Sequence, residues 1–118
     1  CYMTNENALS WLQARNHCLA FNADLVSITG SRDQALITEL MSNSTAPAFW
    51  IGGNQMKENS GWVWSDGAPF SFFNWDEGKP DNLTGSELCI EVDRSNYAWS
   101  DQDCSNQLAF ICKKPGQK

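Results

Sequence analysis

Acidic side chains gather in and beside one long polar stretch of the chain, which runs from Trp75 to Asp101. These acidic residues are Asp76, Glu77, Asp81, Glu87, Asp93, Asp101 and Asp103. Carboxylate oxygens are the ligands that calcium prefers, and an acidic surface also suits a basic protein partner. A polar loop of this length is usually functional or disordered. Because Cys89, Cys104 and aromatic residues border it, we expect an ordered loop that holds a ligand.

The same acids raise the question of catalysis. Asp81 and Glu87 meet the minimal requirement for a glycosidase pair, but any two acids in one loop would do so. His17 is the one histidine of the chain and stands within a helical pattern, so no Ser–His–Asp set can be assembled around it. No glycine-rich phosphate loop is present in the sequence. We therefore predict that the protein is not an enzyme.

Length and composition limit the remaining classes. The 118 residues are 42% hydrophobic and 19% charged, which fits one globular domain over residues 1–118. No apolar run is long enough to cross a bilayer, so we predict no membrane span. The formal net charge of −6 argues against nucleic acid as a partner, because phosphate binding requires a basic face. Binding to a protein or a glycan remains.

Five cysteines in this short chain indicate an oxidising compartment, and hence an extracellular or cell-surface protein. Their spacing lacks the paired C-x-x-C arrangement of a zinc site, so we interpret them as disulfide-forming. Two sequons, at Asn43 and Asn82, are compatible with glycosylation in the secretory pathway. For the odd cysteine, Cys1, we expect a partner upstream in a larger ectodomain. The alternative is that Cys1 pairs internally and another thiol is free.

The hydrophobic pattern predicts two helices in the first half of the chain. Ser10 is a suitable N-cap for a helix that runs to about residue 21. The inward stripe of this helix consists of Trp11, Ala14, Arg15 and Cys18. Ser31 and Gln34 form a capping-box pattern for a second helix, which ends near Ser42. The predicted buried stripe of the second helix consists of Leu36, Ile37, Leu40 and Met41.

Strand patterns dominate the second half. We expect a short edge strand at residues 1–3, a brief strand at 24–28, and further strands at 49–53, 62–64 and 108–113. Residues 88–92 and 97–99 form a predicted hairpin across residues 94–96. Tryptophan side chains in these strands belong in the core, and we interpret Trp75 as an anchor of the long loop. Because helices come early and strands late, the pattern indicates an α+β fold.

Ten short segments follow one another along the whole chain. They read A-L-S-W-L-Q-A-R-N-H-C, A-D-L-V-S-I, F-W-I-G-G, W-V-W-S-D-G, F-N-W, K-P-D-N, C-I-E-V, A-W-S-D, D-C and F-I-C-K-K. In this order they resemble the C-type lectin-like domain, most closely the tandem domains of endocytic receptors of the mannose receptor group. The resemblance implies a double-loop α+β fold with two helices, small antiparallel sheets and a long loop. It also implies two internal disulfides, Cys18–Cys112 and Cys89–Cys104.

The resemblance further implies where a ligand would bind. In sugar-binding members, one calcium on the long loop contacts sugar hydroxyls. Its ligands come from a Glu-Pro-Asn or Gln-Pro-Asp triplet, a following glutamate and a Trp-Asn-Asp triplet. The residues that match by position are Lys79, Pro80, Asp81, Glu87, Trp99, Ser100 and Asp101. Together with Asn82 they form the predicted ligand-binding loop.

Two departures from the family pattern weaken this site. Lys79 stands where an oxygen ligand is expected, and an ammonium group has no acceptor and repels a divalent cation. Ser100 offers a short hydroxyl where an asparagine amide would reach the metal. Asp81, Glu87 and Asp101 remain as metal ligands, whereas calcium takes about six to eight oxygens. The predicted calcium site is therefore incomplete.

Two interpretations follow. In the first, Lys79 lies among these three acids and replaces the metal charge, so no cofactor is required. The protein is then an extracellular ligand-binding module of a receptor. It recognises a protein or glycoprotein with absent or weak calcium dependence, beside neighbouring domains of the same receptor. In the second, Lys79 turns to solvent and the acids bind Ca²⁺ weakly, which would leave a calcium-dependent carbohydrate-binding domain. We favour the first.

Overall fold

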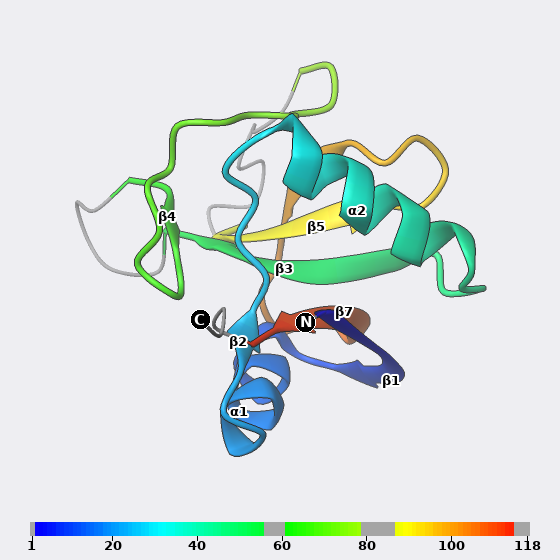
Figure 1. Ribbon diagram of the computed structural model, residues 1–118, viewed down its shortest axis with the longest axis vertical. Coiled ribbons are helices and arrows are strands. Elements are labelled where there is room, and N and C mark those ends of the chain that lie inside the picture. Colours follow the sequence, from blue (N-terminus) through cyan, green and yellow to red (C-terminus); the bar gives the residue numbers. More distant parts are fainter. Residues whose placement is uncertain (1, 56–60, 79–86, 115–118) are drawn as a thin grey trace.

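The computed structural model describes residues 2–55, 61–78 and 87–114. Within these ranges the chain forms two helices and seven strands (Figure 1). In chain order they are β1 (Tyr2–Leu9), α1 (Trp11–Ala20), β2 (Asp24–Leu25), α2 (Ser31–Ser42), β3 (Ala48–Asn54), β4 (Val63–Trp64), β5 (Cys89–Asp93), β6 (Trp99–Gln102) and β7 (Leu108–Lys113). The predicted α+β class is confirmed, with both helices in the first half of the chain.

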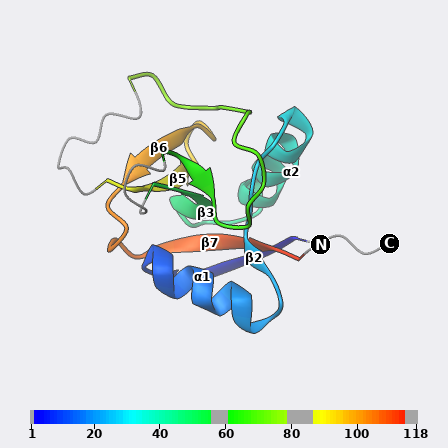
Figure 2. The same cartoon turned by 90° about the vertical axis from the view of Figure 1, so that its left-hand side faces the viewer.

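The strands join into one sheet with the order β1-β7-β3-β5-β6, to which β2 adds on β7 and β4 on β3. All of these pairs are antiparallel except β3 with β7, which are parallel. This parallel contact is short, with Phe49 opposite Ala109 and Trp50 opposite Phe110. It connects two small antiparallel parts, β1–β7 and β3–β5–β6. In Figure 2, α1 lies on one side of β7, and β3, β5 and β6 lie on the other.

Alternation along the strands divides the core into two hydrophobic clusters. In β3, Phe49 and Ile51 belong to one cluster and Trp50 belongs to the other, because successive side chains of a strand point to opposite faces. The first cluster includes Ile37 and Met41 of α2. The second includes the buried face of α1. Each helix therefore closes one of the two clusters.

The start of α1 confirms the prediction from Ser10. The Ser10 hydroxyl accepts a hydrogen bond from the N–H of Gln13 at 3.3 Å, and the Gln13 side chain accepts one from the N–H of Ser10 at 3.2 Å. This reciprocal pair is a capping box, which satisfies two N–H groups that a helix start would leave without a partner. Trp11, Ala14 and Cys18 are buried as predicted.

The start of α2 corrects the predicted capping box of Ser31 and Gln34. The N-cap is Gly30, and Ser31 is already helical. Instead, the carboxylate of Asp33 accepts hydrogen bonds from the N–H and the hydroxyl of Thr29, at 3.0 and 2.9 Å. Burial acts to raise the pKa of Asp33, but these hydrogen bonds, the positive charge of Lys113 and a hydrogen bond from Tyr2 together lower that pKa below its usual value. The pattern misled because the Gln34 side chain makes tertiary contacts instead: it donates to the carbonyl of Tyr97 at 3.2 Å and accepts from Trp99 at 2.9 Å.

The predicted buried stripe of α2 is only half right. Ile37 and Met41 are fully buried, whereas Leu40 is half-buried and Leu36 keeps 40% of its surface exposed. A helix on one face of a sheet buries a stripe about 100° wide. Ile37 and Met41, four residues apart, occupy the centre of that stripe. Leu36 and Leu40 form the neighbouring ridge, which remains in contact with solvent.

The predicted strands are found at the expected positions in the sequence, but some differ in length from the prediction. β1 extends well beyond residue 3, because it pairs with β7 from Tyr2 opposite Lys113 to Leu9 opposite Leu108, with one register shift. β2 is shorter than the predicted strand at residues 24–28, although Leu25 is buried as expected. The predicted hairpin is confirmed as β5 and β6.

Both disulfides implied by the family resemblance are present. Cys18–Cys112 joins α1 to β7 with a Cα–Cα distance of 5.6 Å, and Cys89–Cys104 joins β5 to the segment after β6 with a Cα–Cα distance of 5.3 Å. Among the described residues, neither helix is long and apolar enough to span a membrane.

Gly53 in β3 has no room for a side chain. A Cβ atom at this position would overlap Cδ1 of the fully buried Ile90 and lie 2.9 Å from its Cγ1. Gly53→Ala should therefore lower the free energy of unfolding in a urea titration by about 1–3 kcal/mol through overpacking. Ile90→Ala removes the clashing atoms, so the double variant should lose less than the two single losses combined. Strict additivity would contradict this explanation.

Candidate functional site

The start of the predicted ligand-binding loop is fixed to β6 through Trp99. This residue has no exposed surface. Its N–H donates to the carbonyl of Asn74 at 2.9 Å, and its carbonyl accepts from the N–H of Asp76 at 2.8 Å. Trp75 thus pairs with Trp99 in a parallel bridge, and their rings meet edge-to-face at 5.7 Å between centroids. The indole Nε1 of Trp99 donates to Gln34 of α2 at 2.9 Å. Trp75 is therefore an anchor of the loop, as predicted.

A cluster of aromatic rings surrounds Trp99. We call it the aromatic cluster; its members are Trp62, Trp64, Phe70, Phe72, Phe73, Trp75 and Trp99, with ring centroids 4.7–6.1 Å apart within the contacting pairs. Aromatic pairs at such separations contribute about 0.5–1.5 kcal/mol each beyond the area they bury. The chain that leads into the loop is thus held mainly by apolar packing.

The far end of the loop is held by β3 and by a disulfide. The carbonyl of Leu88 accepts a hydrogen bond from the N–H of Gln55 at 2.9 Å, and Cys89 lies opposite Asn54 in the sheet. Cys89 is bridged to Cys104, whose carbonyl accepts from the N–H of Trp11 at 2.9 Å. The chain is therefore tied to the folded body both before residue 79 and after residue 86.

Half of the predicted site falls in the described part of the chain. Four predicted residues lie outside the described residues: Lys79, Pro80, Asp81 and Asn82. In β6, Ser100 pairs opposite Glu91 and Asp101 pairs opposite Ile90. Neighbouring residues of a strand face opposite sides, so Asp101 shares the face of Trp99 and is only 2% exposed. Ser100 and Glu87 are half-buried.

The described residues do not by themselves assemble a calcium site. Glu87, Ser100 and Asp101 offer two carboxylates and a hydroxyl, whereas calcium takes about six to eight oxygen ligands. Within residues 2–55, 61–78 and 87–114, no group of three His, Cys, Asp or Glu side chains is placed to hold a metal. Asp101 also makes interactions within the protein, in keeping with the rule that a buried carboxylate needs hydrogen bonds or an opposite charge.

Two acids near the loop have a structural role that the sequence reasoning missed. The Oδ1 atom of Asp93 accepts hydrogen bonds from the N–H and the hydroxyl of Ser95, both at 2.8 Å. Asp103 repeats this arrangement with Ser105, at 2.9 and 2.7 Å. The Asp-x-Ser spacing is the signal that predicts such turns, because an Asp side chain mimics a backbone carbonyl. These carboxylates close turns beside β6 rather than form part of a metal site.

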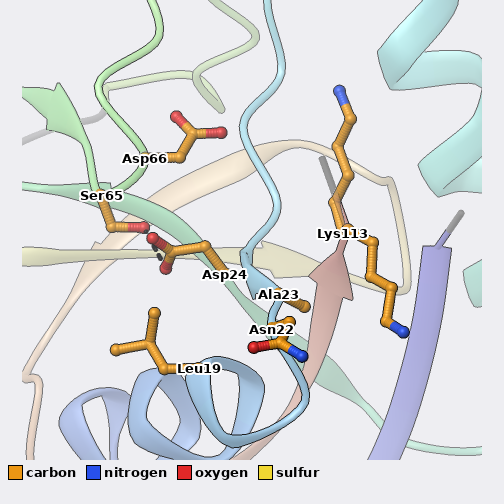
Figure 3. A pocket seen from close by; sticks show the side chains of 8 residues that line it. Leu19, Asn22, Ala23, Asp24, Ser65, Asp66 and Lys113 are labelled. Carbon is orange, nitrogen blue, oxygen red and sulfur yellow. Dashed lines mark hydrogen bonds between the residues drawn. The ribbon is translucent and has the colours of Figure 1, made fainter. Parts of the chain in front are cut away.

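A hollow of about 710 Å³ with both polar and apolar lining opens elsewhere, between the end of α1, β2, the turn after β4 and the end of β7 (Figure 3). Its carboxylates already serve the fold. Asp24 accepts hydrogen bonds from Arg15 at 3.1 Å and from the hydroxyl of Ser65 at 2.9 Å. Asp66 accepts one from the hydroxyl of Ser27 at 2.8 Å. We therefore assign this hollow a structural role.

Asp24 connects three elements, since it belongs to β2 and binds both Arg15 of α1 and Ser65 after β4. Asp24→Asn keeps the size of the side chain but removes the charge that faces Arg15. We expect the free energy of unfolding in urea to fall by about 1–3 kcal/mol. Glu77→Gln, at an exposed position, is the matched control and should change stability by no more than about 0.5 kcal/mol. Equal losses in the two variants would contradict the role given to Asp24.

The fold, the two disulfides and the anchored loop together define a class of protein. The family model described as the Lectin C-type domain matches residues 7–114. The chain belongs to this family.

Two relatives illustrate where the chain stands within the family. It is 37% identical over 111 residues to ladderlectin of Oncorhynchus mykiss, covering 92% of this chain and 58% of ladderlectin. It is 36% identical over 115 residues to C-type mannose receptor 2 of Homo sapiens, covering 97% of this chain and 8% of the receptor. The predicted similarity to the mannose receptor group is confirmed. The chain spans little more than half of the first relative and a small part of the second.

Solved structures share the fold across nearly the whole chain. The calcium-independent type II antifreeze protein has a TM-score of 0.84 and 28% identity, covering 95% of this chain and 83% of its own. A Ca²⁺-dependent type II antifreeze protein in its Ca²⁺-free form has a TM-score of 0.88 and 29% identity, covering 98% and 91%. The same fold therefore occurs in calcium-independent and in Ca²⁺-dependent proteins. Similarity of fold alone does not determine whether a protein binds calcium, so that question depends on the residues of the loop.

Proposed function

We propose that residues 1–118 form a single ligand-binding domain of an extracellular or cell-surface receptor, and that its activity is binding rather than catalysis. The family membership supports a binding role, and the receptor among the relatives supports a place in a larger ectodomain beside further domains. The two disulfides support an oxidising compartment.

The proposed ligand is a protein or glycoprotein, bound at the loop between Trp75 and Asp101 with absent or weak calcium dependence. The observation that carries this proposal is the donor set. Lys79 occupies a position where calcium-binding members carry an oxygen ligand, and Ser100 is too short for the next one. In this proposal the Lys79 ammonium takes the place of the metal's positive charge among Asp81, Glu87 and Asp101, so the loop does not require a metal.

The way the loop is held supports the same proposal. At the start of the loop, the segment Asn74–Asp76 is hydrogen-bonded to β6. At the other end of the loop, Leu88 is hydrogen-bonded to Gln55 and Cys89 is bridged to Cys104. None of these contacts uses a metal. The aromatic cluster, to which Trp99 belongs, adds apolar packing at the start of the loop. A calcium-free loop needs such internal support to present a defined surface, because an unsupported polar loop of this length would be disordered.

A calcium-dependent carbohydrate-binding domain is the second candidate. It is favoured by the three acids that remain at the family's metal positions and by the Ca²⁺-dependent structural neighbour. Here Lys79 would turn to solvent, and Asp81, Glu87 and Asp101 would hold Ca²⁺ with the help of water.

Binding to immobilised sugars separates the two candidates. The purified chain is passed over mannose-, galactose- and N-acetylglucosamine-bearing polymers in millimolar calcium and then in EDTA. The proposal predicts no EDTA-sensitive retention on any of the three polymers. Retention that is lost in EDTA and also lost in Asp81→Asn would establish the second candidate. Turnover of a chromogenic glycoside that disappears in the same variant would instead contradict a purely binding role.

A further inference from the structure

An apolar hollow of about 350 Å³ lies between β1 and α2. Its lining consists of Tyr2, Leu36, Glu39, Leu40 and Asn43. Leu36 is 40% exposed, and Tyr2 and Leu40 are half-buried. This group of apolar side chains is small, and only larger exposed apolar patches mark protein interfaces. The occupant that the hollow can take is therefore a small molecule or a short attached group.

Asn43 stands at the rim of this hollow and begins the sequon Asn43-Ser44-Thr45. It is the exposed C-cap residue of α2, and its Nδ2 donates a hydrogen bond to the carbonyl of Glu39 at 3.3 Å. An amide that carries a sugar keeps one N–H, so this bond can persist. Thr45 is exposed, whereas Ser44 is buried and its hydroxyl donates to Glu6. The native fold therefore exposes both Asn43, which would be modified, and Thr45, which completes the sequon.

We propose that Asn43 carries an N-linked glycan, and that the first sugars of this glycan cover the hollow formed by Tyr2, Leu36 and Leu40. In the secretory pathway the donor is a lipid diphosphate that bears an oligosaccharide. Nδ2 of Asn43 forms a bond to the anomeric carbon of N-acetylglucosamine and loses one proton. The bond from that carbon to the diphosphate oxygen breaks, and the lipid diphosphate leaves.

The covalent link explains why the glycan, rather than another molecule, fills the hollow. A tethered sugar is present at a high effective concentration next to its own attachment site. The C–H faces of a pyranose ring are apolar and can rest on leucine and tyrosine side chains, while the hydroxyls remain in water. The hollow is also small, with a volume suited to one or two sugar units rather than to a protein interface.

The first part of the test asks whether the glycan is present. The chain is expressed in a eukaryotic host that secretes high-mannose glycoproteins, in the Asn82→Gln background so that only one sequon remains. Peptide mass spectrometry should find the Asn43 peptide heavier by one N-glycan. Thr45→Ala, which keeps Asn43 but breaks the sequon, should remove this mass completely. An unmodified Asn43 peptide in the secreted protein would overturn the proposal.

The second part asks whether the sugar covers the hollow. Endoglycosidase trimming leaves one N-acetylglucosamine on Asn43, and this form is compared with the sugar-free Thr45→Ala variant. The melting temperature of the trimmed form should be higher by about 2–4 °C. The same comparison in the Leu36→Ala background should show less than half of that increment. An equal increment with and without the Leu36 side chain would overturn the packing. So would the absence of any increment.

Discussion

Removal of the Cys18–Cys112 disulfide by a Cys18→Ala/Cys112→Ala double variant is expected to lower the free energy of unfolding by about 4–5 kcal/mol. The bridge joins residues 94 positions apart, so it restricts nearly the whole unfolded chain. Small domains have a total stability of about 5–15 kcal/mol. The variant should therefore unfold at a much lower urea concentration, and its m-value should rise because the unfolded state expands.

The matched control is the Cys89→Ala/Cys104→Ala variant. This bridge closes a span of only 15 positions, for which the same chain-entropy model predicts about 3 kcal/mol. The difference between the two variants thus tests loop length, while the number of lost sulfur–sulfur bonds is equal. A larger loss in the short-span variant would contradict this account and would place the main stabilisation in the base of the loop.

Replacement of Trp99 by alanine is the other variant with a large expected effect. Trp99 has no exposed surface, and its removal leaves a cavity among the rings of the aromatic cluster. It also leaves the side-chain oxygen of Gln34 without the indole N–H that now donates to it. We expect a loss of about 3–5 kcal/mol in the free energy of unfolding, measured by urea denaturation followed by circular dichroism.

Phe73→Ala is the control for the loss of one aromatic ring. Phe73 belongs to the same aromatic cluster but keeps 57% of its surface exposed. Its replacement should therefore cost at most about 1 kcal/mol. If Trp99→Ala proved as mild as Phe73→Ala, the Trp99 side chain would not hold the aromatic cluster and Gln34 together as described.

Much of the fold was predictable from local patterns and from the family resemblance. Ser10 caps α1 as predicted, because an N-cap side chain contacts N–H groups only two or three residues further along the chain. The hairpin of β5 and β6 followed from alternation. The disulfide partners did not follow from the residues, since cysteine positions alone leave the pairing open. They followed from the family resemblance.

The errors in the α2 stripe and in the length of β1 share a physical cause, which is tertiary packing. Leu36 and Ile37 are adjacent and equally apolar, and only the placement of α2 on the sheet decides that Ile37 is buried while Leu36 faces solvent. The length of β1 depends on its partner β7, about a hundred residues away. Asp93 and Asp103 are a different case, because their contacts are local: we interpreted both as solvated loop charge, but each accepts hydrogen bonds from a serine two residues on.

For the candidate site, the sequence provided the types of the residues and the structure shows which elements position them. Ser100 and Asp101 lie in β6, next to the anchored start of the loop, and Glu87 lies two residues before the Cys89–Cys104 disulfide. The arrangement of Lys79 and Asp81 remains a proposal, because both lie outside the described residues. The chemistry of their side chains therefore carries the calcium argument.

The most direct test of that argument is the stability of the purified chain in excess EDTA and in millimolar calcium. A ligand that binds only the native state at 100 times its Kd raises stability by about 2.7 kcal/mol. We expect no difference between the two conditions for the natural sequence. A Lys79→Gln/Ser100→Asn variant, which restores two oxygen ligands, should gain a calcium-dependent rise. A calcium-dependent rise in the natural sequence that disappears in Asp81→Ala would contradict the account and identify a calcium-binding lectin domain.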